Sequence, residues 1–188
     1  MKRILFLLLF PCFCFGQNII DEVDEFTGDR KIVFNSLRKK KQPIIVVENS
    51  GQAIPVKEIK DLYDQIIMTI TVNGNHFFND KSQLWVLFED GEKHIFDIEL
   101  YGNLIQSPNY YSDSYTSAYY SYLDFTISEN FIEDMSNGRQ IKTIRLFTTD
   151  GYIDYKNSGW LGANKEKKRQ EGLKTWFTNI KNYRSSKK

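Results

Sequence analysis

Tyrosines are concentrated in one segment of this chain, where their side chains could bind a ligand. Residues 109–122 hold six of the 11 tyrosines, interleaved with serine, threonine and aspartate. A tyrosine offers a large, rigid ring with a hydroxyl at its tip, which is the chemistry that binding loops use for glycans and peptides. The sequence therefore predicts a ligand-binding surface that includes Tyr110, Tyr111, Tyr115, Tyr120 and Tyr122.

A second aromatic candidate is Trp160, which has Gly159 before it and Gly162 shortly after it. A tryptophan on a loop bounded by glycines could stack on a sugar ring or a peptide side chain. Both segments also have an ordinary structural interpretation. Tyrosine is common in strands, and Trp160 could instead fill the core at the start of the helix that follows.

The two histidines do not form a recognisable catalytic motif. His76 follows Asn73-Gly74 in a predicted loop, and His94 lies on a predicted strand. Their spacing is not that of a zinc helix, and the chain has no Gly-x-Ser-x-Gly elbow. A zinc site would need His76, His94 and a carboxylate to converge. The simpler expectation is that His94 is a partly covered strand residue.

Carboxylates offer the remaining route to catalysis, because two of them facing each other across a cleft can hydrolyse a glycosidic bond. Residues 21–25 are acidic but lack the central glycine of a calcium loop, so we expect a solvated N-terminal segment there. The chain also has no glycine loop that could hold a phosphate. We therefore expect no cofactor, no metal and no catalytic residue. For the alternative of a carboxylate pair, four acidic residues lie on predicted strands: Asp97, Glu99, Asp124 and Asp154.

The first sixteen residues have the features of a cleaved signal peptide. Lys2 and Arg3 precede an unbroken apolar run, and Cys14 and Gly16 supply small residues at the two positions that signal peptidase reads. The apolar stretch is shorter than the roughly 20 residues that span a bilayer. The sequence thus predicts a signal peptide over residues 1–16, export to the periplasm, outer membrane or exterior, and a single domain over residues 17–188.

Composition excludes several classes of function for the mature chain. Both cysteines, Cys12 and Cys14, lie in the leader, so disulfides, thiolate metal sites and cysteine nucleophiles are excluded. Loss of Lys2 and Arg3 changes the net charge from +1 to −1, so acidic and basic residues are nearly balanced. Such a charge favours neither nucleic acid nor an anionic membrane as a partner.

Alternating apolar residues predict several strands, including residues 30–37, 44–47 and 65–72, whereas residues 56–63 fit either a helical turn or a strand. Two hairpins are expected around Asp90-Gly91 and Asp150-Gly151, because a tight loop needs the left-handed backbone that this dipeptide supplies. A two-residue loop in the first hairpin would place Trp85 and Leu87 on the same apolar face as His94, Phe96 and Ile98. In the second hairpin, the core face would consist of Ile144, Leu146, Ile153 and Tyr155, opposite a solvated face with Arg145, Asp154 and Lys156.

Two helices are predicted. Ser128 can cap a short helix over residues 129–136, and Asn164 can cap a longer C-terminal helix. The longer helix has one apolar stripe, formed by Leu173, Trp176, Phe177, Ile180 and Tyr183. We expect this stripe to pack on the sheet of the same chain; docking on a partner would require Trp176 or Phe177 to be exposed.

A short motif, Asp24-Glu25-Phe26-Thr27-Gly28, follows the leader. This opening resembles that of uncharacterised exported β-rich proteins of Gram-negative bacteria, in which an Asp-x-Phe-Thr-Gly motif comes soon after the signal peptide. In those proteins the motif leads into a domain that has a strand-Asp-Gly-strand hairpin similar to residues 84–98. The resemblance implies an exported β-rich protein and no particular activity.

Together these patterns predict a mainly β (α+β) fold, an antiparallel, sandwich-like domain with a short helix and a C-terminal amphipathic helix packed on it. We interpret the chain as an exported, non-enzymatic protein that recognises a glycan, a peptide or an envelope protein through its tyrosine-rich loop. A carboxylate-dependent hydrolase and a structural envelope partner are the alternatives. We expect no nucleic-acid partner and no integral membrane segment after signal cleavage.

Overall fold

The computed structural model describes residues 17–23, 30–36, 43–47, 53–62, 65–74, 76–98, 111–113, 116–118, 120–157 and 162–186. Several predicted features lie outside these residues: the signal peptide, the motif over residues 24–28, Glu99, Tyr110, Tyr115 and Trp160. For Tyr111 and Tyr120, only the backbone is described.

The described strands form antiparallel sheets, which confirms the predicted mainly β fold. The larger sheet has the order β1 (Gln17–Val23), β2 (Arg30–Ser36), β4 (Ala53–Leu62), β5 (Gln65–Asn73) and β10 (Tyr120–Ile127), with β3 (Ile44–Val47) also paired to β4. The four-stranded sheet has the order β12 (Gly151–Lys156), β11 (Ile141–Thr148), β6 (Gln83–Phe88) and β7 (Lys93–Asp97). A small third sheet pairs β8 (Tyr111–Asp113) with β9 (Thr116–Ala118).

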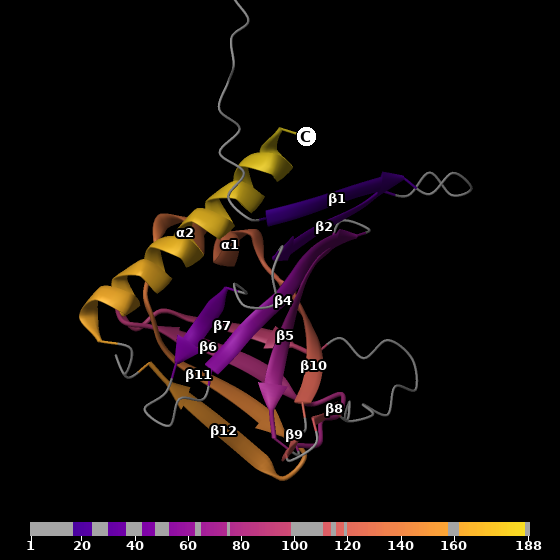
Figure 1. Cartoon of the computed structure of the whole chain (residues 1–188), viewed down its shortest axis with the longest axis vertical. Helices are drawn as coiled ribbons and strands as arrows, with labels where there is room; N and C mark the ends of the chain where they lie inside the picture. Colours follow the sequence, from indigo (N-terminus) through magenta and orange to yellow (C-terminus); the bar gives the residue numbers. More distant parts are fainter. Residues whose placement is uncertain are drawn as a thin grey trace, which may run out of the picture.

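The two larger sheets share one hydrophobic core. A bridge between Ile98 and Phe125 joins the end of β7 to β10, and the buried side chains of both sheets belong to a single cluster. In Figure 1 the four-stranded sheet lies below β1 and β2, and the helices α1 (Glu129–Asn137) and α2 (Ala163–Ser185) lie beside each other along one side. Among the described residues, neither helix is long and apolar enough to cross a membrane.

Helix α1 begins and ends where the sequence indicates. The Phe131 amide donates to the Ser128 hydroxyl at 3.2 Å, which satisfies one of the free amides of the first turn. Gly138 ends the helix with a φ of +82°, a left-handed conformation that glycine adopts without a steric penalty. Helix α2 begins earlier than predicted, since Gly162 and not Asn164 is its cap residue.

The apolar stripe of α2 packs within its own chain. Trp176 is 7% exposed and Phe177 is fully buried, in the same core cluster as the sheet residues. The Phe177 ring meets the Phe131 ring of α1 edge-on at 5.9 Å between centroids. This burial confirms the predicted packing on the sheet, and it contradicts the alternative in which the stripe docks on a partner.

The described part of the acidic N-terminal segment, residues 21–23, forms the end of strand β1 and is exposed, as expected for a solvated segment. Residues 17–23 pair along their whole length with β2. The negative charge of Asp21 is balanced by Arg30, whose Nε lies 2.7 Å from the Asp21 Oδ1. A cross-strand ion pair of this kind permits acidic residues on a strand that charge alone would disfavour. The undecided segment at residues 56–63 likewise belongs to a strand, β4.

The first hairpin differs from its predicted register by one residue. Its loop has three residues, because the Gly91 amide donates to the Phe88 carbonyl at 3.1 Å and the Phe88 amide donates to the Glu92 carbonyl at 2.9 Å. Gly91 has a φ of +91°. This pattern is a type I turn followed by a glycine bulge, a common three-residue hairpin loop that also uses Asp-Gly.

A one-residue change of register moves every side chain of a strand to the opposite face. Trp85 therefore pairs with Ile95, and Leu87 with Lys93, on the outer face of the four-stranded sheet. The prediction that Trp85 and Leu87 share the core face of His94 is wrong. The inner face of this hairpin consists of Leu84, Val86, Phe88, His94, Phe96 and Ile98.

The second hairpin has the predicted faces. Ile144 pairs with Tyr155 on the buried side, and Arg145 pairs with Asp154 on the other side. Its loop consists of residues 149 and 150, so the register differs from the predicted one by two residues. A shift of two residues leaves every side chain on its original face.

Candidate functional site

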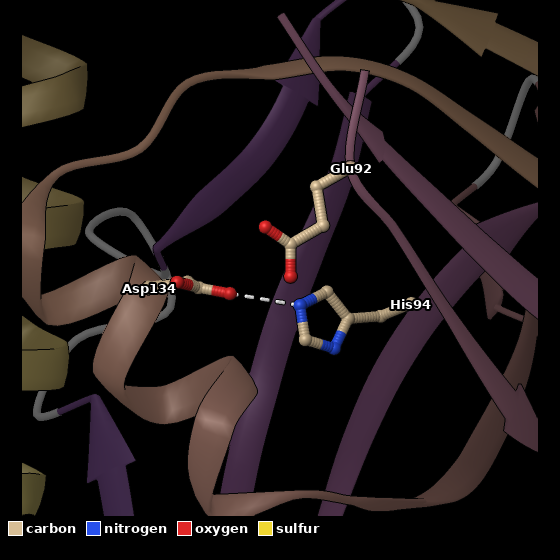
Figure 2. Close-up of side chains that lie close together, drawn as sticks. All are labelled: Glu92, His94 and Asp134. Atoms are coloured by element: carbon tan, nitrogen blue, oxygen red, sulfur yellow. Dashed lines mark hydrogen bonds and ion pairs between the residues drawn. The ribbon is translucent and has the colours of Figure 1, made fainter. Parts of the chain in front are cut away.

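One group of side chains has the composition of a metal or acid–base site. Glu92 and His94 come from β7 and the turn before it, and Asp134 comes from α1 (Figure 2). One ligand atom from each of the three residues lies within 4.8 Å of the others. The His94 Nε2 is 2.8 Å from the Asp134 Oδ2, and both side chains are largely covered. His76 is not part of this group, so the structure does not form the histidine pair considered from the sequence.

The carboxylates of this group already have a cationic partner in Arg139. The Arg139 Nη1 lies 2.5 Å from the Glu92 Oε2 and 2.9 Å from the Asp134 Oδ1, and its Nη2 bonds to Asp90. The guanidinium lowers the pKa of Asp90, and the three carboxylates raise the pKa of Arg139. A divalent ion bound here would have to compete with a guanidinium that already pairs with both carboxylates of the group. The geometry therefore favours an ion-pair network over a metal centre.

The network connects the β6–β7 turn to the end of α1. His94 stacks on Phe96 at 5.9 Å between ring centroids and meets Phe131 edge-on at 5.4 Å, so its ring belongs to the aromatic core. Its position as a partly covered strand residue is the one predicted. Because Glu92, His94 and Asp134 each have an ion-pair or hydrogen-bond partner inside the network, the arrangement can stabilise the fold.

Three of the four carboxylates considered for hydrolysis are described, and each has a polar partner of its own. Asp97 accepts from the Gln83 amide at 2.8 Å, and Asp154 pairs with Arg145 at 2.6 Å at the opposite edge of the four-stranded sheet. Asp124 lies on the other large sheet and accepts from the Thr69 hydroxyl at 2.5 Å. Thr69 is only 2% exposed, so its hydroxyl group has little access to water.

The tyrosine-rich segment is described in part. Its residues contribute β8, β9 and the start of β10. Tyr122 is 39% exposed on the face of β10 opposite Leu123 and Phe125, and the Lys57 ammonium lies 4.4 Å from its ring centroid. The described residues thus place one of the five candidate tyrosines at the surface. In Figure 1, β8 and β9 lie at the lower end of the molecule, as does the β11–β12 turn.

A different surface collects more exposed apolar side chains, and we call it the outer aromatic face. It is the outer side of the four-stranded sheet, where alternate residues of β6, β7, β11 and β12 point away from the core. Tyr152 is 57% exposed and Ile95 is 45% exposed. The outer aromatic face is defined by Trp85, Leu87, Ile95, Phe147 and Tyr152.

Its rings form a row across three adjacent strands. The Trp85 and Phe147 centroids are 4.9 Å apart, and those of Phe147 and Tyr152 are 6.0 Å apart. The Arg145 guanidinium lies 3.9 Å from the Tyr152 centroid, and the Lys93 ammonium lies 4.2 Å from that of Trp85. Cation–π contacts of this kind hold the rings in place and position N–H donors beside them.

Polar side chains next to the rings are oriented by hydrogen bonds. The Gln83 Oε1 accepts from the Trp85 Nε1 at 3.0 Å, while the Gln83 amide donates to Asp97. Arg145 forms two parallel bonds with Asp154, at 2.6 and 2.8 Å, and this pairing lowers the pKa of Asp154. Such planar groups have fixed donor and acceptor directions, which is what a ligand with several hydroxyls requires.

Sequence reasoning did not identify this face as a candidate site. The predicted two-residue loop places Trp85 on the core face, and no face is predicted for Phe147. One feature of the sequence does indicate this face. On the side of the second hairpin that is predicted to be solvated, Phe147 and Tyr152 lie next to Arg145 and Asp154. An aromatic pair in that position is unusual for a surface that only meets water.

Comparisons with protein-family models, curated proteins and solved structures found nothing that matches this chain. What can be said of its function therefore depends on the geometry described above.

Proposed function

We propose that this protein is an exported, non-enzymatic binding protein whose ligand docks on the outer aromatic face. The observation that carries the proposal is the row of Trp85, Phe147 and Tyr152 on a solvent-facing side of the sheet. Exposed apolar patches bounded by polar groups are typical of interaction sites in soluble proteins. Rings held in a row by neighbouring cations lose little conformational freedom when a ligand binds.

The absence of a suitable acid–base group in the described residues supports the non-enzymatic part of the proposal. His94 and Asp134 are bonded to each other and covered, and the carboxylates of the two large sheets have separate partners. A catalytic pair would need two groups of different protonation state that face one cavity. The residues that the structure describes show no such pair for the hydrolase alternative.

The exported part of the proposal rests on the leader. N-terminal sequencing of the protein isolated from its native cell should give Gln17 as the first residue, and fractionation should place it in the envelope or the medium. Recovery of the intact leader on a cytosolic protein would contradict this part of the proposal.

Binding can be tested by a pull-down from envelope extract with the protein starting at Gln17. Three proteins are compared: the unmodified chain, Tyr152→Ala and Tyr122→Ala. The last is a matched control, since both residues are exposed tyrosines with a cation over the ring, but they lie on different sheets. We expect Tyr152→Ala to retain much less envelope material than the unmodified chain, and Tyr122→Ala to retain the same amount.

The two candidate surfaces give opposite results. If the tyrosine-rich segment is the binding surface, Tyr122→Ala loses retention and Tyr152→Ala keeps it, and the outer aromatic face is wrong as the site. If the unmodified chain retains nothing from envelope extract, the binding proposal itself fails.

A further inference from the structure

We infer that the ligand of the outer aromatic face is an uncharged glycan chain. This inference rests on the proposed binding function and adds the chemical class of the ligand. Three properties of the face lead to it: the row of rings, the oriented polar pairs beside them, and the small size of the patch.

The rings suit the apolar faces of sugar rings. A pyranose presents a surface of C–H groups that are weakly positive, and the face of an aromatic ring is negative. Trp85, Phe147 and Tyr152 lie on three adjacent strands, with Phe147 directly opposite Tyr152 and diagonal to Trp85, so the rings form a path across the sheet. A linear chain of sugars can contact successive rings along that path.

The polar groups suit hydroxyls, and the charges of the face are nearly balanced: the cations are Lys93, Arg145 and Lys156, and the carboxylates are Asp97 and Asp154. Gln83 and Asp97 form one hydrogen-bonded pair beside Trp85, and Arg145 and Asp154 form another beside Tyr152. The charge of the Arg145 guanidinium is already neutralised by the Asp154 carboxylate. An anionic ligand would have to compete with that carboxylate, whereas a hydroxyl can use the remaining donor and acceptor directions of the pair.

The size of the patch argues against a stable protein partner. Strands lie about 4.8 Å apart and rise about 3.3 Å per residue, so four strands over five residues cover roughly 300 Å². A stable protein interface buries about 800 Å² on each partner. A peptide that adds a strand would use the backbone groups of a sheet edge, and the rings of the outer aromatic face would not take part.

The test repeats the pull-down with the unmodified chain, using envelope extract that has been divided beforehand into two portions. One portion is oxidised with periodate, which cleaves the vicinal diols of sugars, and the other is digested with a protease. A glycan ligand predicts that periodate abolishes retention and that protease leaves it unchanged. The same protein is then run by affinity electrophoresis in gels that contain soluble β-glucan, dextran or alginate. We expect at least one neutral polysaccharide to retard it more strongly than the anionic alginate.

Variants complete the experiment. Tyr152→Ala should weaken retardation by the neutral polysaccharide by about 3- to 10-fold, the effect expected for loss of one aromatic contact. Tyr122→Ala should leave retardation unchanged. Retention that survives periodate but not protease would overturn the glycan assignment while leaving the binding function intact. The assignment is also overturned if only alginate retards the protein. If untreated envelope extract gives no retention at all, the proposed function fails together with this inference.

Discussion

Two aromatic clusters lie on opposite faces of the four-stranded sheet, and they differ in what covers them. The inner cluster includes Phe96 and Phe131, whose centroids are 5.0 Å apart, and it continues to Phe177 and Trp176 of α2. Helices α1 and α2 supply this cover. The outer cluster contains rings at similar separations, but Tyr152 remains 57% exposed.

Because of this difference in cover, the two clusters contribute differently to the stability of the fold. Burial of the inner rings removes a large apolar area from water and contributes to the free energy of folding. The outer rings gain much less from folding because water still reaches them. Threonine or lysine would be the ordinary choice on such a strand face, and the binding function that we propose would account for the rings, because a ligand would cover them.

The largest expected effect is the loss of the ring at the centre of the inner cluster. Phe131 is fully buried and contacts the rings of Phe88, Phe96 and Phe177. Phe131→Ala should lower the free energy of unfolding by about 3–5 kcal/mol, because it removes a large side chain and leaves a cavity. Urea unfolding followed by circular dichroism measures this change.

An exposed phenylalanine is the matched control. Phe77 is 61% exposed, so Phe77→Ala should change the free energy of unfolding by no more than about 0.5 kcal/mol. A loss below about 1 kcal/mol for Phe131→Ala would show that the inner cluster does not stabilise the fold in the way described.

The next effect concerns the polar border of the inner cluster. Asp134 bonds to His94 and to Arg139, and its side chain is 17% exposed. Asp134→Ala should cost about 1–3 kcal/mol, since it leaves two partly covered partners with fewer hydrogen bonds. Thermal and urea unfolding report the loss. Asp80→Ala removes an exposed carboxylate and should have no measurable effect; equal losses in both variants would contradict the role of the network.

The hairpins and helices show how far the sequence predicts this molecule. The Ser128 cap, the α2 stripe and the faces of the second hairpin follow from local patterns and are confirmed. The face of Trp85 does not follow, because Asp-Gly is compatible with both a two-residue loop and a three-residue loop with a bulge. A local dipeptide cannot distinguish a register from its neighbour one residue away, yet that step decides which side chains face water.

The sequence also could not identify the polar network or strand β1. Glu92, His94, Asp134 and Arg139 come from a turn, a strand and the end of a helix, and only the tertiary fold brings them together. Strand β1 is acidic, and its pairing depends on Arg30 from the following strand. The described tyrosine, Tyr122, was predictable because strand alternation continues from the buried Leu123.

A smaller effect is expected in acid, at the contact between α2 and β3. Arg169 donates to the carbonyls of Ile44 and Ile45, which ties α2 to β3, and it bonds to Glu166. Arg169, followed by Gln170 and Asn157, lowers the pKa of Glu166 from 4.5 to about 2, against the opposing effect of burial.

The direction of the pH effect on stability follows from the lowered pKa of Glu166. The contribution of Glu166 to stability is complete above pH 4.5 and is lost as the pH falls from 4.5 through 2. Because Glu166 is partly solvated, we expect a loss of about 1 kcal/mol, less than the full shift would imply. Urea unfolding at pH 6 and pH 3 measures it. Glu166→Gln should be less stable at pH 6 and should lose less between the two pH values; an unchanged difference would contradict the assignment to this carboxylate.

The smallest effect on stability is expected on the outer aromatic face. Tyr152→Ala removes an exposed ring and one cation–π contact, so the free energy of unfolding should fall by about 0.5 kcal/mol or less. The same variant should lose most of its retention of envelope material. A loss of several kcal/mol would instead mean that the outer rings stabilise the fold, and the contrast between the two clusters would disappear.

The most direct test of the central claim is hydroxyl-radical footprinting read by mass spectrometry. The protein starting at Gln17 is labelled alone and with envelope extract, and modification of each exposed aromatic residue is compared. We expect the extract to protect Tyr152 and to leave Tyr122 unchanged, because the ligand that we propose would cover the outer aromatic face. Equal labelling of Tyr152 with and without extract, while Tyr122 becomes protected, would contradict the account.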